Sequence, residues 1–263
     1  MIECSGFNKV SLVDWPGRIA ATVFLRRCNF RCPWCQNPEL VESSLFDTPV
    51  PVDDILHYLR RRRAMLDGLV VTGGEPTLSR YLTLFLTRVK EIGVPVKLDT
   101  NGSHPELVCG LLDERLVDVI AVDYKVPLRL YGDLVGFKNP ECVAATIAAV
   151  LRRRCGYVRT TIVPGLHTEE LLAEMVKAFP ELNQTNYRLQ GFRPGNCLDP
   201  AYNSLPPIAP EVIDHLARRI VKSDSHPVHQ LDSCPDGPVR RNGHQRLTHY
   251  VLHTHQSSTA RDT

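Results

Sequence analysis

The chain of 263 residues is long enough for one large α/β domain or two small ones, and its 43% apolar and 23% charged residues are typical of a globular protein. A net charge of +2 gives no indication of nucleic-acid binding. No segment reaches the roughly 18–20 consecutive apolar residues of a membrane span. The start, MIECSGFNKVSLVDWPG, lacks the basic and apolar regions of a secretory signal. We therefore expect a cytoplasmic protein with no membrane and no nucleic acid among its partners.

Short apolar runs alternate with helical patterns along the chain. In chain order, strands are predicted at 19–25, 68–73, 94–100, 117–124, 157–164 and, more weakly, 186–192, and helices at 52–64, 79–92, 105–115, 139–154, 168–178 and 209–221. Six strand–helix units in this order predict an α/β fold in which helices cover a parallel sheet.

Polar or reactive residues lie near or directly after the end of most predicted strands, and within the fifth and sixth strands. They are Cys28; Gly73, Gly74 and Glu75; Asp99, Thr100, Asn101 and Gly102; Asp123 and Lys125; Thr160 and Thr161; and Gln190. In barrel-type α/β proteins, ligands gather at the carboxyl ends of the strands. The pattern therefore predicts one barrel-like site at this edge of the sheet.

The sequence changes character after about residue 222, where it loses its periodicity and becomes rich in His, Ser, Pro and Asp. Four histidines, His244, His249, His253 and His255, suggest metal binding, but no cysteine or carboxylate framework accompanies them. We predict a folded domain over 1–221 and a mobile tail over 222–263, with at most one short strand, at RLTHYVLH.

Three of the nine cysteines, Cys28, Cys32 and Cys35, lie within the segment RRCNFRCPWCQNPEL. An odd number of cysteines in a cytoplasmic protein argues against a disulfide framework, so metal ligation is the better interpretation of this cluster. Three closely spaced thiolates suit a cubane iron–sulfur cluster and leave one iron free. The spacing also fits an incomplete zinc site, although structural zinc normally takes four ligands. Spacing alone leaves both open.

Five motifs together resemble the radical S-adenosylmethionine (SAM) superfamily. They are CNFRCPWC, with the aromatic Trp34 before the third cysteine, VTGGEPTL, LDTNG, VDYK and TTIVPG, within residues 5–195. Within that superfamily, SLVDWPGRIAATVFLRRCNFRCPWCQNPEL is most similar to the glycyl-radical activating enzymes, in particular those that serve anaerobic ribonucleoside-triphosphate reductases. The resemblance implies a partial (β/α)6 barrel, which agrees with the six units above.

The resemblance also implies roles for the cysteine loop. Cys28, Cys32 and Cys35 would ligate a [4Fe–4S] cluster, and its open iron would chelate the amino and carboxylate groups of SAM. Trp34 would lie near the adenine; packing beneath the loop is its alternative role. Related activases often have Gly before the first cluster cysteine, where this chain has Arg27, which would alter how the loop packs.

Further roles fall on the strand ends. Gly73, Gly74 and Glu75 would take the amino group of SAM, since glycines let the backbone approach closely and a carboxylate pairs with an ammonium. Asn101 and Lys125 are assigned to the cofactor or its ribose, although Asn101 would also suit a helix cap. The resemblance implies that Asp99, Thr100 and Asp123 would hold a monovalent cation beside the cofactor carboxylate. It also implies that Asp14, Pro16 and Gly17 would lie near the docking site of the protein substrate; a simple turn is their alternative role.

The implied reaction is the activation of a partner enzyme. The reduced cluster would cleave SAM to methionine and a 5′-deoxyadenosyl radical, which would remove a hydrogen from a glycine Cα in a glycyl-radical reductase. A low-potential electron donor such as flavodoxin or ferredoxin would supply the electron. A radical SAM enzyme that acts on a small molecule, another peptide or pyruvate formate-lyase is the alternative. A zinc-binding scaffold is the third hypothesis, and it would leave the residues at 73–75 and 99–102 without a function.

Overall fold

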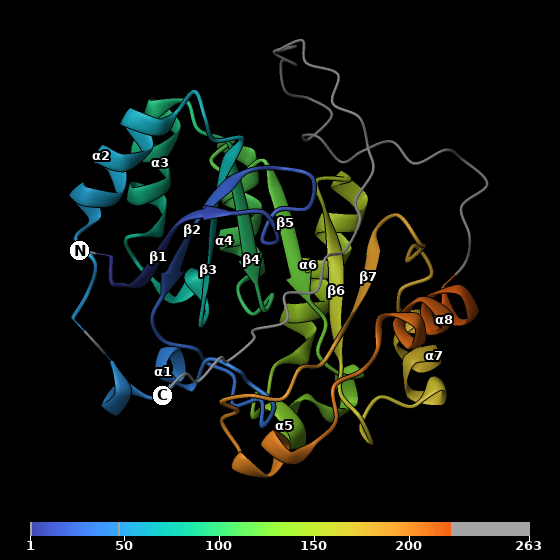
Figure 1. Cartoon of the computed structure of the whole chain (residues 1–263). Helices are drawn as coiled ribbons and strands as arrows, with labels where there is room; N and C mark the ends of the chain where they lie inside the picture. Colours follow the sequence, from blue (N-terminus) through green and yellow to red (C-terminus); the bar gives the residue numbers. More distant parts are fainter. Residues whose placement is uncertain (1, 47, 222–263) are drawn as a thin grey trace, which may run out of the picture.

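The computed structural model describes residues 2–46 and 48–221, which form one curved sheet with helices on its outer side (Figure 1). Seven strands follow one another across the sheet in chain order. They are β1 (Cys4–Ser11), β2 (Ala20–Leu25), β3 (Gly68–Gly73), β4 (Val96–Thr100), β5 (Val119–Asp123), β6 (Gly156–Ile162) and β7 (Tyr187–Gly191). Strands β2 to β7 are parallel, so the predicted partial barrel of six parallel strands is confirmed.

Six of the helices are those that the periodicity predicts. They are α2 (Val52–Arg62), α3 (Leu82–Ile92), α4 (Pro105–Asp113), α6 (Pro140–Arg153), α7 (Glu169–Ala178) and α8 (Pro210–Ile220). Two short helices, α1 (Pro38–Val41) and α5 (Tyr131–Val135), were not predicted, because one turn of helix leaves no periodic pattern. Each predicted helix begins within three residues of its expected start.

The first strand, β1, was also not predicted. It pairs antiparallel with β2 at one edge of the sheet, and only Cys4 and Ser11, its first and last residues, are buried. A strand without an apolar run or a clear alternation escapes pattern analysis. The register of β1 shifts twice, between Cys4 and Gly6 and between Asn8 and Ser11, and Cys4 forms an isolated bridge with Val50.

The two faces of the sheet are buried in different ways. The outer face, represented by Val23, Val71 and Ile120, belongs to the main hydrophobic core under the helices. On the inner face, Trp15 lies against a separate apolar group near the amino ends of the strands: Ala20, Val70, Val119, Ala121 and Tyr157. This group fills the end of the barrel that is opposite the cysteines.

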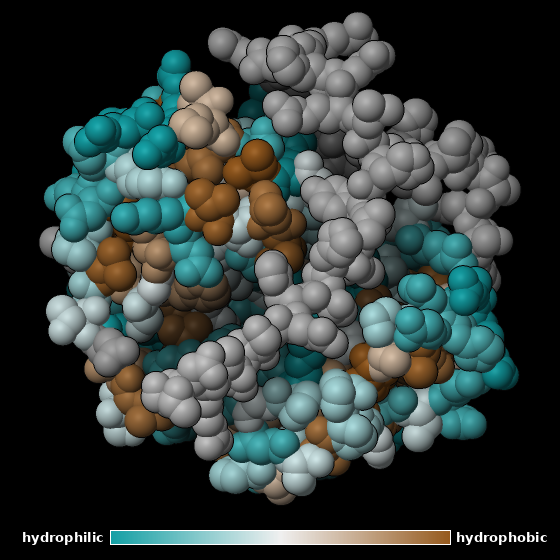
Figure 2. Space-filling model, in the orientation of Figure 1, coloured by the Kyte–Doolittle hydropathy of each residue, from teal (hydrophilic) through white to brown (hydrophobic). Residues whose placement is uncertain are grey.

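Exposed apolar side chains gather at the connection between β1 and β2, as the hydrophobic colouring of that region shows (Figure 2). They are Val10, Leu12, Val13 and Ile19, and Val13 is 82% exposed. Contiguous apolar surface of this kind is typical of a contact with another macromolecule.

Two sequence-based expectations concern the end of the chain and membranes. The predicted tail, with its four histidines and its possible strand, lies outside the described residues. Among the helices that the structure describes, none is both long enough and apolar enough to cross a membrane.

Candidate functional site

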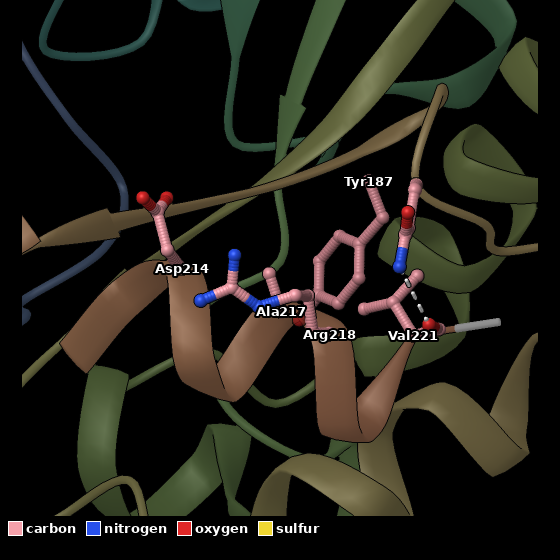
Figure 3. A pocket seen from close by; sticks show the side chains of 6 residues that line it. Tyr187, Asp214, Ala217, Arg218 and Val221 are labelled. Carbon is pink, nitrogen blue, oxygen red and sulfur yellow. Dashed lines mark hydrogen bonds between the residues drawn. The ribbon is translucent and has the colours of Figure 1, made fainter. Parts of the chain in front are cut away.

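One cavity of about 190 Å³ lies at the carboxyl ends of the parallel strands, where the strand-end pattern placed the site. All three clustered cysteines line it, and so do most of the predicted site residues: Trp34, Gly73, Gly74, Asp99, Thr100, Asn101, Asp123 and Lys125. A second cavity, of about 350 Å³, lies between α8 and the start of β7 (Figure 3). Its wall carries Asp214 and Arg218 but none of the predicted site residues, so we place the chemistry in the first cavity.

The cysteine loop is a tight, largely buried turn after β2. The backbone N–H of Phe30 donates to the sulfur of Cys28 at 3.4 Å, and the N–H of Cys35 donates to the carbonyl of Cys32 at 2.9 Å. Burial raises the pKa of Cys28 to about 11 and that of Cys32 to about 12, and it also raises the pKa of Cys35. Without a cationic partner these groups stay protonated thiols, whereas metal ligation requires the thiolate.

Two glycines at the end of β3 hold this loop against the sheet. The N–H of Gly74 donates to the carbonyl of Leu25, and a Cβ at Gly73 would lie 2.2 Å from that carbonyl oxygen. A Cβ at Gly74 would lie 2.2 Å from the carbonyl oxygen of Arg27, which accepts from the N–H of Glu75 at 2.7 Å. These positions require glycine because they lie against the backbone of residues 25–27, which leads into Cys28.

Arg27, directly before Cys28, has a φ of +71°. In this left-handed conformation, which favours Gly, its carbonyl accepts from the N–H of Glu75. An L-residue other than Gly pays about 1–2 kcal/mol for such a φ. The side chain recovers little, because its 3.7 Å contact with Glu3 is exposed on both sides.

We therefore expect Arg27→Gly to raise the free energy of unfolding by about 0.5–1 kcal/mol, because relief of strain exceeds the added chain entropy. Urea unfolding of the metal-free protein measures this effect. Arg27→Lys, which keeps the Cβ and the charge, is the matched control and should leave stability unchanged. A Gly variant less stable than the wild type would contradict the strain at this position.

Glu75 is 1% exposed, and the structure does not place it on the cavity wall. One of its carboxylate oxygens accepts from the N–H and hydroxyl of Thr77 and from the hydroxyl of Thr100, at 2.5–3.0 Å. The other accepts from the N–H of Asn101 at 2.6 Å. Burial raises the pKa of Glu75, and these hydrogen bonds oppose the rise. The side chain therefore joins the turns after β3 and β4.

Two aspartates on the wall are enclosed by three basic side chains. Lys97 pairs with one oxygen of Asp99, and Arg159 lies 3.4 Å from the other. The Nε of Arg159 donates to Asp123 at 2.6 Å, and Lys125 donates to the second oxygen of Asp123 at 2.9 Å. Although burial alone would raise it, these ion pairs hold the pKa of Asp123 well below its usual range. These alternating basic and acidic side chains connect β4, β5 and β6.

Trp34 lies on the cavity wall and also packs against neighbouring rings. Its ring lines the cavity, but it is only 5% exposed and packs edge-on against His167, with ring centroids 6.2 Å apart, and near Tyr202 at 6.3 Å. His167 accepts from the N–H of Val163, and its other ring nitrogen lies 2.8 Å from the carbonyl oxygen of Lys125. Burial lowers the pKa of His167, which favours this neutral arrangement.

The structure separates one predicted group from the others. Asp14, Pro16 and Gly17 do not line the cavity and lie near the amino ends of the strands, where Asp14 accepts from Thr22 at 2.6 Å. Gly17 has a φ of +79° and open space around it, as a turn requires. Conversely, Arg159 and Lys97 were not singled out in the sequence, although Arg159 is on the cavity wall and Lys97 pairs with a wall residue.

The three thiols fit a cubane cluster better than a single metal ion. A structural zinc ion normally takes four Cys, His or carboxylate ligands, and only three thiols lie in this loop. The cavity wall contains no fourth cysteine and no histidine among the described residues. A cubane bound here would keep one iron without a protein ligand.

Comparison with known proteins agrees with this geometry. Residues 22–178, more than half of the chain, match the model of the radical SAM superfamily. The chain therefore belongs to the radical SAM superfamily of enzymes, which bind a [4Fe–4S] cluster and SAM.

The curated relatives define the type more closely. A Methanocaldococcus jannaschii protein assigned to the glycyl-radical enzyme activating enzymes is 31% identical over 210 residues, which cover 77% of this chain and 85% of that protein. The pyruvate formate-lyase-activating enzyme of Staphylococcus aureus is 30% identical over 175 residues, 60% of this chain and 67% of the other. A shorter match, 34% identical over 84 residues, covers 36% of the 7-carboxy-7-deazaguanine synthase of Aquifex aeolicus. Within the superfamily, the chain is of the glycyl-radical activating type.

Solved structures give looser matches. Native anSMEcpe with bound AdoMet is 18% identical, with a TM-score of 0.49, over 66% of this chain and 50% of that one. QueE from Escherichia coli is 15% identical, with a TM-score of 0.47, over 72% of this chain and 83% of that one.

Proposed function

We propose that Cys28, Cys32 and Cys35 each ligate one iron of the cluster and that the remaining iron is the place where SAM binds. The observation that carries this proposal is the cavity wall, which offers three thiols and neither a fourth cysteine nor a histidine among its described residues. When bound, cluster and SAM together supply one-electron cleavage of the cofactor and a radical able to abstract hydrogen. The protein supplies chelation, orientation and exclusion of water.

The wall residues divide this work. Gly73 and Gly74 expose backbone to the cavity, where it can accept from the ammonium of SAM. Lys125 presents a cation to the carboxylate of SAM, and Asn101 presents its amide, which donates to Asn29 at 2.8 Å, beside the cysteine loop. Trp34 presents its ring to the adenine. Glu75 acts as a positioning residue, because its hydrogen bonds fix the turns on which Gly74 and Asn101 lie.

The substrate that we propose is a glycine of an anaerobic ribonucleoside-triphosphate reductase, with a flavodoxin or ferredoxin as electron donor in the cytoplasm. The SLVDWPG segment and its resemblance to activases of that reductase support this choice. The apolar patch of Val10, Leu12, Val13 and Ile19 is a surface for contact with a macromolecule, although it lies at the end of the barrel opposite the cavity. Pyruvate formate-lyase is the second candidate, because one relative bears that enzyme's name. Action on a small molecule is the third.

The test is electron paramagnetic resonance of candidate partners after anaerobic incubation with the reduced holoprotein and SAM. We expect the doublet of a glycyl radical on the ribonucleotide reductase and none on a reductase whose radical glycine is replaced by alanine. A doublet on pyruvate formate-lyase alone would favour the second candidate. Cleavage of SAM without a radical on either protein would contradict activation.

A further inference from the structure

The structure assigns to Lys97 the electrostatic place that the resemblance gives to a monovalent cation. We propose that its ammonium, together with Arg159, neutralises the aspartates beside the SAM site, so that SAM binding does not depend on potassium or sodium. This inference rests on the proposed function, because it takes SAM as the ligand of the cavity.

The geometry of the expected cation site carries the argument. A metal cation there would bind carboxylate oxygens of Asp99 and Asp123, but all four of these oxygens already face a basic nitrogen of this chain. Lys97 is 0% exposed, and its ammonium contacts Asp99 directly. It also lies 5.8 Å from the centroid of the Tyr157 ring, whose face attracts a cation.

Electrostatics points the same way. Lys97, Arg159 and Lys125 alternate with the two aspartates, so an added cation would approach three positive groups at short range. Lys97 itself lacks water and depends on Asp99, because an unpaired buried ammonium costs several kcal/mol. The pair is therefore a permanent part of the barrel. Lys97 acts through Asp99 and is a positioning residue.

The experiment measures SAM affinity of the anaerobic holoprotein at one ionic strength, set with choline, sodium or potassium chloride. For the wild type we expect the dissociation constant to differ by less than about twofold among the three salts. Lys97→Met keeps the length of the side chain but leaves Asp99 short of one partner. In choline we expect this variant to bind SAM about tenfold more weakly, with recovery in potassium or sodium.

Two variants isolate the cause. Lys97→Arg keeps a cation at the position and should bind SAM equally in all three salts. Lys90 is on α3, away from the cavity, and pairs with Asp118 at 2.7 Å. Lys90→Met should therefore not make SAM binding depend on potassium or sodium. The unfolding temperature of the SAM-free holoprotein is a second readout, and potassium should raise it in Lys97→Met more than in Lys90→Met.

The outcomes are separable. Wild-type affinity that rises tenfold or more with potassium would overturn the role of Lys97 and leave the proposed function intact. Absence of SAM binding in every salt would overturn the proposed function and this inference with it. The wild-type comparison decides the matter even if Lys97→Met does not fold.

Discussion

Replacement of Cys32 by alanine is expected to abolish the iron–sulfur cluster and the formation of 5′-deoxyadenosine together. Cys32 is the most buried of the three clustered thiols, at 7% exposure, so no water or added thiol easily replaces it as a ligand. A cubane with two protein ligands would not be retained, and bound iron should fall from about four per chain to near zero. Iron and acid-labile sulfide analysis, with chromatography of the products, measures both effects.

The matched control is Cys197→Ser. Cys197 is also buried, at 4% exposure, and the carbonyl of Cys35 accepts from the N–H of the neighbouring Leu198 at 2.8 Å, but Cys197 does not line the cavity. This variant should keep the cluster. Cofactor cleavage retained by Cys32→Ala would refute the ligand assignment. One zinc ion per chain in the wild type would refute the cluster itself.

Replacement of Glu75 by alanine is expected to lower the free energy of unfolding by at least about 3 kcal/mol. The change removes the acceptor of four hydrogen bonds and leaves the buried N–H groups of Thr77 and Asn101 without it. Weaker SAM binding should follow, because the turns after β3 and β4 lose their connection. Glu75→Gln keeps the shape of the side chain but turns an NH₂ group toward one donor. Its free energy of unfolding should therefore lie between those of the wild type and Glu75→Ala.

Chemical unfolding and SAM binding, measured on the same variants, separate the two roles of Glu75. A direct ligand of the SAM ammonium would lose affinity in Glu75→Gln at unchanged stability, whereas a positioning residue loses stability as well. Glu106→Ala removes an exposed carboxylate from the first turn of α4 and should cost no more than about 1 kcal/mol. An unchanged unfolding energy in Glu75→Ala would show that the internal hydrogen bonds contribute nothing.

Most of the parallel sheet was predictable, because its strands are apolar runs buried on at least one face. Strands such as β3, with the burial of Leu69 and Val71 on one face and Val70 on the other, leave a plain signal. The missed strand β1 lies at the edge, where exposed residues such as Lys9 interrupt the pattern. Its place became visible only through its pairing with β2.

The sequence predicts which strand ends and motifs form the site, but not the hydrogen bonds and ion pairs that the side chains make there. Nothing in GGEP shows which groups the Glu75 side chain binds, since that depends on Thr100 and Asn101 of the next turn. Lys97 did leave a signal. It stands two residues before Asp99 on the same strand, so the period of two places both side chains on one face. The ion pairs of Arg159 with Asp99 and Asp123 could not be foreseen, because they depend on the register of β5 and β6, which places Arg159 beside Asp123.

The irregular pairing of β1 has a consequence for self-association. A sheet that does not close into a full barrel has an outermost strand at each side, and a flat outermost strand is a template for another chain. Two register shifts within β1 bend that strand and interrupt its free row of N–H and C=O groups, and the bridge from Cys4 to Val50 covers one end of it. This distortion thus discourages strand-to-strand aggregation at this side of the molecule.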